Sequence, residues 1–381
     1  MASVKNNKIG LDVRSLKLSG GVKTYIERLL EYYEKEKNFD FKLFGIDSYK
    51  HFECFDSSVS IDSFWRLFYE NITISRLFKK NNIGIFHGMK LVCPYFGNFK
   101  KVITVHDIIP VICPESMKFK DLVYWKYFFP LYLKKADIII CISEATKKDL
   151  IYHFKINPEK IRIIYQGFSP KMFYKIDTKK SFTNLEKYLL SEDFKIKNLS
   201  ERKILLNVNV LSPRKNIDAL IKAFNGVARK DKDVCLFIVG KEGWKCEKIM
   251  REYENSPYKG RIFFLGFVPE DVLLNLYNVA EFFIYPSLYE GFGLPILEAQ
   301  ACGCPVITSR VSSLPEVGGD SVLYFNPESV KDIRKVIQNA LEYPEAREKL
   351  ITEGFKNIKR FSWDKCAKET LKIYQDLYDE R

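Results

Sequence analysis

The chain has 381 residues, more than one hydrophobic core usually serves, so we expect two domains. Its 46% hydrophobic and 29% charged residues are typical of a globular protein. It has no run of about 20 apolar residues that could span a membrane, and its first residues, MASVKNNKIGLDV, lack the apolar core of a signal peptide. The nine cysteines are scattered without a CxxC pair, which favours free thiols in the cytoplasm.

The net charge of +13 is concentrated in the first half of the chain. Residues 1–175 hold 29 Lys and Arg against 18 Asp and Glu, whereas the remainder holds 32 against 30. A basic first half favours an anionic partner, such as acidic lipid, a phosphorylated acceptor or nucleic acid. A lysine-rich surface that only aids solubility is the alternative.

Short apolar runs alternate with helix-length amphipathic stretches through the first half. We expect strands at 8–13, 41–46, 83–88, 101–107, 137–143 and 161–165. We expect helices over 22–35 and 115–135 and from 144 onward. This alternation predicts a parallel, doubly wound sheet in a Rossmann-like domain over 1–175.

The polar stretch 176–202 interrupts this alternation and is interpreted as a linker with at most one short helix. The alternation then resumes, with strands expected at 203–210, 234–240, 262–267, 281–287 and 305–309. Helices are expected from 216, over 269–279 and from 295. A second Rossmann-like domain is therefore predicted over 203–360, followed by a helix over 361–381 that can pack on either domain, including the N-terminal one.

The stretch SLYEGFGLPILEAQACGCPV places Glu290 and Glu298 eight positions apart, after an apolar strand. The loop after such a strand lies at the carboxyl edge of the sheet, where open α/β sheets bind ligands. Gly291 and Gly293 let backbone amides approach a ligand, and Pro295 is expected to begin a helix, with Glu298 in its first turn. Free amides there suit a diphosphate, and carboxylates suit sugar hydroxyls. The alternative is a solvated loop glutamate and a glutamate that complements the helix dipole.

Two other strand-end loops carry residues suited to a ligand. LSPRKNIDALIKAF places Arg214 and Lys215 beside a helix start, where two cations suit two phosphates, although a basic surface turn is the alternative. LKLSGG ends in Gly20 and Gly21, which permit close approach of a ligand or form a structural turn.

TVHDIIP places His106 and Asp107 at the carboxyl end of a strand. His106 is a catalytic candidate there, but a core histidine bound to a backbone carbonyl remains an equal alternative. The amphipathic stretch 63–80 could rest on a membrane surface or pack as a helix on its own sheet.

Other ligand-binding motifs are missing. No Walker lysine pattern occurs, and GFGLPI has Ile296 where a dinucleotide fingerprint requires glycine or alanine. The DKD at 231–233 resembles a metal-binding motif, but it precedes a strand and is interpreted as a turn. No metal site is predicted.

The stretch YPSLYEGFGLPILEAQACGCPVITSRVSSLPEVGGDSVLYFNP resembles the signature of retaining glycosyltransferases of the GT-B fold, the large family-four group. Four further motifs resemble the same family in the same order: SPRKN, VGKEGW, FLGFVPEDVLLNLYNVA and FSW. Within the family, these motifs are most similar to those of mannosyltransferase B-type bacterial polysaccharide enzymes. The resemblance implies two Rossmann-like domains facing a central cleft, the first for the acceptor and the second for a nucleotide sugar. The chain departs from many relatives at Asn207-Val208-Asn209, where they carry a glycine.

The resemblance also implies residue roles. Glu290, beside Gly291, would contact the donor hexose and share the catalytic role with His106, and Glu298 would bind the ribose. The diphosphate would bind two cations and three residues with free amides: Arg214, Lys215, Phe292, Gly293 and Leu294. The base would lie near two loops that contain Gly240, Lys241, Gly266, Phe267 and Val268. The acceptor or phosphate loop of the first domain would contain Gly20, Gly21 and Asp107.

The implied activity is transfer of a hexose, with mannose from GDP-mannose as the best expectation, onto a glycan or lipid-linked acceptor in surface polysaccharide or lipopolysaccharide synthesis. No cofactor or metal is expected. The protein is expected in the cytoplasm, with peripheral association at the inner membrane face as an option. The alternatives are a UDP-sugar transferase, a sugar-nucleotide epimerase of the same fold and a basic nucleic-acid binder. The last is disfavoured because no nucleic-acid motif is present.

Overall fold

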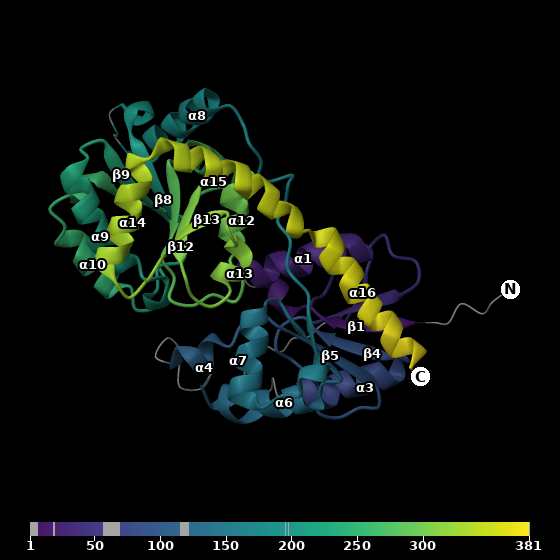
Figure 1. Ribbon diagram of the computed structural model, residues 1–381. Coiled ribbons are helices and arrows are strands. Elements are labelled where there is room, and N and C mark those ends of the chain that lie inside the picture. The colour runs from purple at the N-terminus through teal and green to yellow at the C-terminus, as the bar shows by residue number, and fades with distance from the viewer. Residues whose placement is uncertain are drawn as a thin grey trace. The chain divides into compact units, whose positions relative to one another are not determined.

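The computed structural model describes residues 7–17, 20–55, 69–114, 122–194, 196 and 198–380. The chain divides into two compact units: Met1–Gly167 with Ser362–Arg381, and Phe168–Phe361 (Figure 1). The second unit therefore begins earlier than expected and includes the stretch predicted as a linker.

That stretch contains helix α8 (Thr178–Ser191), which packs on α11 (Glu270–Val279). Asn278 of α11 fixes the approach to α8, because its side chain accepts a hydrogen bond from the Ile176 amide and donates one to the Tyr174 carbonyl. The expected linker is thus a structural part of the second unit, and the sequence underestimated it because α8 is mostly polar.

Within the described residues, the first unit holds a seven-stranded parallel sheet in the order β3-β2-β1-β4-β5-β6-β7. Its strands are β1 (Lys8–Asp12), β2 (Asp40–Phe44), β3 (Glu53–Phe55), β4 (Ile85–Gly88), β5 (Lys100–Val105), β6 (Ile138–Cys141) and β7 (Ile161–Ile163). The predicted parallel sheet is confirmed. The sequence missed only β3, a three-residue edge strand too short to show a period.

Helices cover both faces of this sheet. They are α1 (Gly21–Tyr33), α3 (Ile74–Lys80), α4 (Ile109–Ile112), α6 (Phe129–Lys135), α7 (Glu144–Phe154) and α16 (Trp363–Asp379). Strand β5 shows the alternation that makes this possible: Ile103 and Val105 join the same cluster as Phe129 of α6. Thr104, between them, points the other way and lies 3.2 Å from the Tyr25 hydroxyl of α1.

Helix α16 returns the chain to the first unit and packs beside α1. The Tyr374 hydroxyl lies 2.5 Å from Nδ1 of His87, whose Nε2 lies 2.8 Å from the Thr104 hydroxyl. Burial lowers the pKa of His87 to about 3, so this imidazole is neutral. Tyr378 adds a hydrogen bond to the Lys8 carbonyl, which joins α16 to the start of β1.

Two helical predictions lie partly outside the described residues. Of the stretch 63–80, the described part ends in α3, which buries Ile74 and Phe78 against the sheet. Helix α3 therefore packs on its own sheet, which was one of the two alternatives predicted for this stretch. Of the helix expected over 115–135, the structure describes a helical run from 122 that continues through a π-helical segment, Tyr124–Phe128, into α6.

A cluster of three buried charges lies at the carboxyl end of β1. The Arg14 guanidinium donates to Asp12 at 2.6 Å and to Glu70 at 2.8 Å. The Tyr132 hydroxyl of α6 donates to the other oxygen of Glu70 at 2.9 Å. We call Asp12, Arg14 and Glu70 the first-unit triad. It joins segments that are 56 residues apart, with almost no solvent exposure.

The second unit holds, within the described residues, a six-stranded parallel sheet in the order β10-β9-β8-β11-β12-β13. Its strands are β8 (Lys203–Val208), β9 (Val234–Val239), β10 (Ile262–Gly266), β11 (Phe282–Tyr285), β12 (Val306–Ser309) and β13 (Val322–Phe325). Strand order reverses beside β8, as in other doubly wound sheets. The sequence did not predict β13, which again is an edge strand.

Helices also cover both faces of the second sheet. The remaining ones are α9 (Ile217–Lys230), α10 (Glu247–Glu254), α12 (Leu294–Ala301), α13 (Leu314–Gly318), α14 (Val330–Glu342) and α15 (Pro344–Asn357). Helices α9, α10 and α14 lie together on one face, and α12 lies on the other (Figure 1). The apolar residues of α9, α10 and α14 form one core with β8, β9 and β11 that includes Phe224, Phe282 and Ile333.

In the part of the chain that the structure describes, which includes all nine cysteines, the thiols are free. No helix among the described residues is long and apolar enough to cross a membrane.

Candidate functional site

Two loops meet at the carboxyl edge of the second sheet. The first follows β8 and forms a 3-10 turn, Pro213–Lys215, directly before α9. The second follows β11 and runs to the start of α12. The Leu288 amide of the second loop donates to the Arg214 carbonyl of the first at 2.8 Å, so the two loops are held together.

Glu290 of the second loop lies between both cations of the first. Its carboxylate is 2.5 Å from Lys215 Nζ and 3.0 Å from Arg214 Nη1. Lys215 also approaches the Tyr285 hydroxyl at 3.3 Å, and Arg214 donates to the Tyr289 carbonyl. We call Arg214, Lys215 and Glu290 the second-unit triad. The sequence predicted all three members but not that they form ion pairs with one another.

The second-unit triad carries a net charge of +1. Burial favours the neutral form of Glu290, but the charges of Lys215 and Arg214 outweigh burial and lower the pKa of Glu290 to about 2. Glu290 is therefore ionised at any physiological pH. A carboxylate fixed in this state accepts hydrogen bonds from hydroxyl groups, and the surplus positive charge suits an anion.

Two serines that the sequence analysis missed hold the Glu290 loop in place. The Glu290 amide donates to the Ser312 hydroxyl at 2.9 Å. The Ser313 hydroxyl lies 2.9 Å from the Glu290 carbonyl and 2.7 Å from the Phe292 carbonyl. Both serines belong to the SSLPEV stretch, so their position within the family signature was the only available signal.

Gly293 directly precedes α12 and has φ of 118°, in the left-handed region that favours glycine. The helix begins at Leu294, so the amides of this turn point out of its N-terminus, as expected for a diphosphate site. The expectation that Glu298 lies in the first turn is wrong. It lies in the second, because the helix begins one residue before Pro295.

Glu298 has different surroundings from Glu290. It is half-buried and accepts a hydrogen bond from the Tyr277 hydroxyl of α11 at 3.3 Å. Burial raises the pKa of Glu298 to about 7, against the smaller lowering by Tyr277. The two glutamates of the signature therefore differ in charge near neutral pH. Glu290 is ionised, whereas Glu298 is partly protonated.

The predicted base region lies at the ends of β9 and β10. The Gly240 amide donates to the Gly266 carbonyl at 2.7 Å, and both glycines have positive φ. Lys241 Nζ lies 4.8 Å from the centroid of the Phe267 ring, which is largely exposed, whereas Val268 is buried. Lys241 and Phe267 thus offer an open, cationic and aromatic surface at the same edge as the second-unit triad.

The residues predicted in the first unit lie at the carboxyl edge of its own sheet. Gly20 precedes α1 with φ of 104°, and Gly21 begins that helix. His106 follows β5; its Nε2 lies 2.9 Å from the Met89 carbonyl and its Nδ1 lies 3.3 Å from the Gln166 amide nitrogen. Burial lowers the pKa of His106 to about 4, so it is neutral. Asp107 accepts from the Ile109 amide at 3.0 Å and closes a turn.

His106 therefore shows the contact expected of a core histidine. Both ring nitrogens have partners, and the Met89 carbonyl fixes the proton on Nε2. A substrate that binds either ring nitrogen of His106 would have to replace the Met89 carbonyl or the Gln166 amide.

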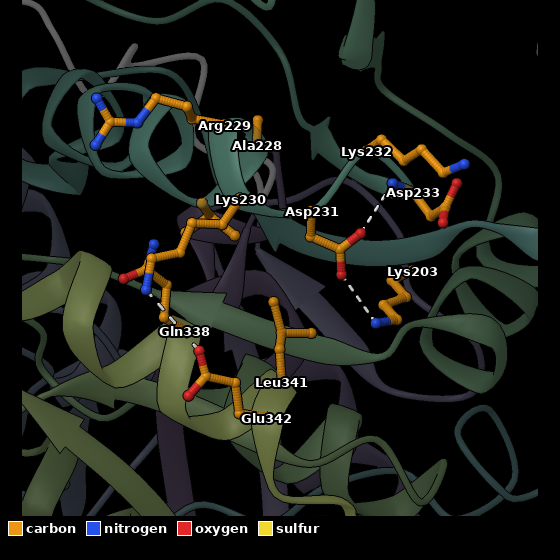
Figure 2. Close-up of a pocket in the computed structure, with 11 residues that line it drawn as sticks. Lys203, Ala228, Arg229, Lys230, Asp231, Lys232, Asp233, Gln338, Leu341 and Glu342 are labelled. Atoms are coloured by element: carbon orange, nitrogen blue, oxygen red, sulfur yellow. Dashed lines mark hydrogen bonds and ion pairs between the residues drawn. The ribbon is translucent and has the colours of Figure 1, made fainter.

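A hollow of about 590 Å³ lies at the opposite edge of the second sheet (Figure 2). It contains the DKD sequence, in which Asp231 pairs with Lys203 at 2.8 Å and accepts from the Asp233 amide at 2.9 Å (Figure 2). The motif is a turn, as predicted. Among the described residues, no group of three or more His, Cys, Asp and Glu side chains is arranged to hold a metal ion.

Two family models match the chain. The model described as Glycosyltransferase Family 4 matches residues 19–171, and the model described as Glycosyl transferases group 1 matches residues 191–357. The chain is 32% identical over 294 residues to the O-antigen chain mannosyltransferase B of Escherichia coli, covering 77% of this chain and 74% of that protein.

Solved structures share the fold. Sucrose-phosphate synthase from Thermosynechococcus elongatus matches with a TM-score of 0.78 at 19% identity, covering 99% of this chain and 100% of that chain. Anabaena HepE in complex with UDP-glucose matches with a TM-score of 0.75 at 16% identity, covering 97% and 99%. With both family models matched in order, the chain belongs to the GT-B glycosyltransferases of the group 1, family-four type.

Proposed function

We propose that this glycosyltransferase transfers mannose from GDP-mannose, with retention of anomeric configuration and without a metal ion, onto a glycan or lipid-linked saccharide of a bacterial surface polysaccharide. The second-unit triad is the observation that carries the proposal. It combines a carboxylate that is ionised at physiological pH with a surplus cation beside the amides of α12. The O-antigen mannosyltransferase relative supports mannose and a polysaccharide acceptor.

Each triad member has a distinct role in this mechanism. Glu290 accepts hydrogen bonds from the mannose hydroxyls and so fixes the orientation of the sugar. Arg214 and Lys215, with the amides from Phe292 to Leu294, stabilise the negative charge that develops on the departing diphosphate. Because Glu290 already orders both cations, they need little rearrangement when the charge appears.

The transfer itself needs no protein nucleophile. The bond from the anomeric carbon to the β-phosphate oxygen breaks, and the acceptor oxygen forms its bond to that carbon from the same face. The leaving phosphate oxygen takes the acceptor proton. His106 takes part as a neutral side chain that binds a substrate, and Glu298 binds the ribose.

The first test measures the melting temperature with GDP, UDP, ADP and dTDP in turn. A ligand at 100 times its dissociation constant stabilises a protein by about 2.7 kcal/mol. We expect the largest shift with GDP. If UDP gives the largest shift, the donor is a UDP-sugar and not GDP-mannose. If none of the four nucleotides shifts the melting temperature, the result contradicts a donor site at the second-unit triad.

The second test incubates the protein with GDP-mannose and a saccharide acceptor, and follows the products by NMR in the presence of a chelator. An α-linked product formed with chelator present supports retention without a metal. A β-linked product or a requirement for added metal would overturn that part of the proposal. Conversion of the donor without acceptor into another sugar nucleotide would indicate an epimerase instead.

A further inference from the structure

One exposed side of the helical run 122–135 in the first unit is apolar. Val123, Tyr127 and Leu131 follow one another at intervals of four residues, which places them on one side of a helix. Their exposed fractions are 36%, 56% and 44%. The opposite side is packed, because Trp125, Phe129 and Leu133 lie in the core. This helix therefore presents apolar side chains to solvent as well as to the sheet.

The aromatic surface continues beyond the end of α6. Lys135 Nζ lies 4.4 Å from the centroid of the Tyr95 ring, and Tyr95 contacts Phe96 edge to face at 5.3 Å. Asn71 connects them to α6, because it accepts from the Tyr95 amide and donates to the Tyr132 hydroxyl. Phe96 is 59% exposed.

A groove of about 480 Å³ runs along the same helix beside the apolar row. The residues that line it include the apolar Val111, Trp125 and Phe154 and the basic Lys126 and Lys134. The α4 end of the groove begins a few residues after Asp107, which is predicted to belong to the acceptor or phosphate loop.

The charges around this surface all have one sign along the helix. From Leu122 to Ala136 the sequence has three lysines and no acidic residue. All three, Lys126, Lys134 and Lys135, are exposed. Lysine stems can lie along apolar surface while their ammonium groups reach an anionic layer. Exposed apolar and aromatic side chains flanked by lysines are typical of a helix that lies in a membrane interface.

We infer that this side of the first unit docks on the surface of an anionic lipid bilayer. The docking face comprises Tyr95, Phe96, Val123, Lys126, Tyr127, Leu131, Lys134 and Lys135. The apolar row enters the headgroup region, and the lysines pair with lipid phosphates. The inference rests on the proposed function for its purpose, since docking would hold the first unit beside a lipid-linked acceptor.

The experiment measures binding of the full chain to vesicles of phosphatidylcholine with phosphatidylglycerol, and of phosphatidylcholine alone. We expect binding to the anionic vesicles that weakens as salt is added. The double variant K126Q/K134Q should bind about 20- to 30-fold more weakly, the factor that corresponds to about 1 kcal/mol for each lysine near an anionic leaflet. Y127S/L131S should also lose binding.

Matched controls lie in the second unit. K331Q/K349Q removes two exposed lysines from α14 and α15, and L190S removes an exposed leucine from α8. Neither control should change vesicle binding, and all variants should keep the wild-type melting temperature. Equal losses in the controls, no binding to anionic vesicles, or equally tight binding of random-sequence RNA would overturn the inference.

Transfer to a water-soluble acceptor saccharide separates the two proposals. We expect the docking-face variants to keep that activity while losing vesicle binding. If the protein binds vesicles but transfers no sugar, the inferred docking face is supported and the proposed function is overturned.

Discussion

Each unit holds a cluster of three charged side chains, two of which lie at or shortly after the end of its first strand, and the two clusters have opposite overall sign. In the first-unit triad, Arg14 lies between two carboxylates, and its side chain is only 4% exposed. In the second-unit triad, one carboxylate lies between two cations, and the Arg214 side chain is 16% exposed. The first-unit triad is shielded from solvent, and Tyr132 donates a further hydrogen bond to its Glu70. The second-unit triad is more exposed to solvent and keeps a surplus positive charge. We therefore expect similar ion pairs to serve structure in the first unit and, under the proposed function, to bind the donor in the second.

Arg14→Met should have the largest effect, because it leaves Asp12 and Glu70 buried together without their cation. Breaking a buried pair in this way typically costs about 3–5 kcal/mol. We expect that loss in the free energy of unfolding of the first unit, measured by denaturant titration. Lys23→Met, which breaks an exposed pair with Glu27, should cost less than about 1 kcal/mol. Equal stability of R14M and K23M would remove the structural role of the first-unit triad.

Glu290→Gln tests the other half of the comparison. We expect turnover to fall by about 10²- to 10³-fold, as when a positioned electrostatic group is removed from an active site. Affinity for the nucleoside diphosphate should stay near wild type, since Arg214 and Lys215 remain. The assay is kcat together with the nucleotide dissociation constant.

The control is Glu281→Gln. Glu281 directly precedes β11, whereas Glu290 follows it, and Glu281 pairs with Arg347. It should leave turnover unchanged. Unchanged turnover in E290Q, or a fall in nucleotide affinity as large as the fall in turnover, would contradict the role given to Glu290.

Glu298→Gln should change how stability depends on pH. The folded state keeps the Glu298 proton up to about pH 7, whereas the unfolded chain releases it near 4.5. The folded state therefore binds more protons between these values, and the free energy of unfolding falls as pH rises from about 4.5 to 7. The variant lacks this fall, so its stability relative to wild type should rise by about 1–2 kcal/mol over that range, after allowance for solvent screening.

Melting curves from pH 4 to 8 measure this difference. Glu328→Gln, at an exposed position, provides a matched control that should follow the wild-type profile. Parallel profiles for E298Q and wild type would contradict the raised pKa.

Gly293→Ala should have an effect of the same size as Glu298→Gln, but one that does not depend on pH. Its φ of 118° is costly for alanine, and the new Cβ would lie 3.0 Å from Leu314 Cδ2. We expect a loss of about 1–2 kcal/mol in the free energy of unfolding of the second unit. Gly260→Ala, where the added Cβ meets open space, should be close to neutral. A neutral G293A would show that the loop before α12 adapts without strain.

The sequence predicted the central strands of both sheets because each is a buried apolar run between turn residues. It missed β3 and β13, which lie at sheet edges and are three and four residues long. It also located Arg214, Lys215 and Glu290 through their place at strand ends. Their mutual pairing, and that of Arg14 with Glu70, could not be predicted, because contacts between side chains 56 to 76 residues apart leave no period in a sequence.

Helix α16 sets the order in which the two units become complete during translation. The ribosome makes most of the first unit first, yet Tyr374 must still bond His87, and Trp363 and Leu377 must still be buried, before that unit is complete. The second unit, Phe168–Phe361, lies wholly between the two parts of the first unit in the sequence. All its residues are therefore synthesised before those of α16. The unit that begins synthesis is thus the last to have all its residues, and until then its sheet lacks the cover that α16 provides.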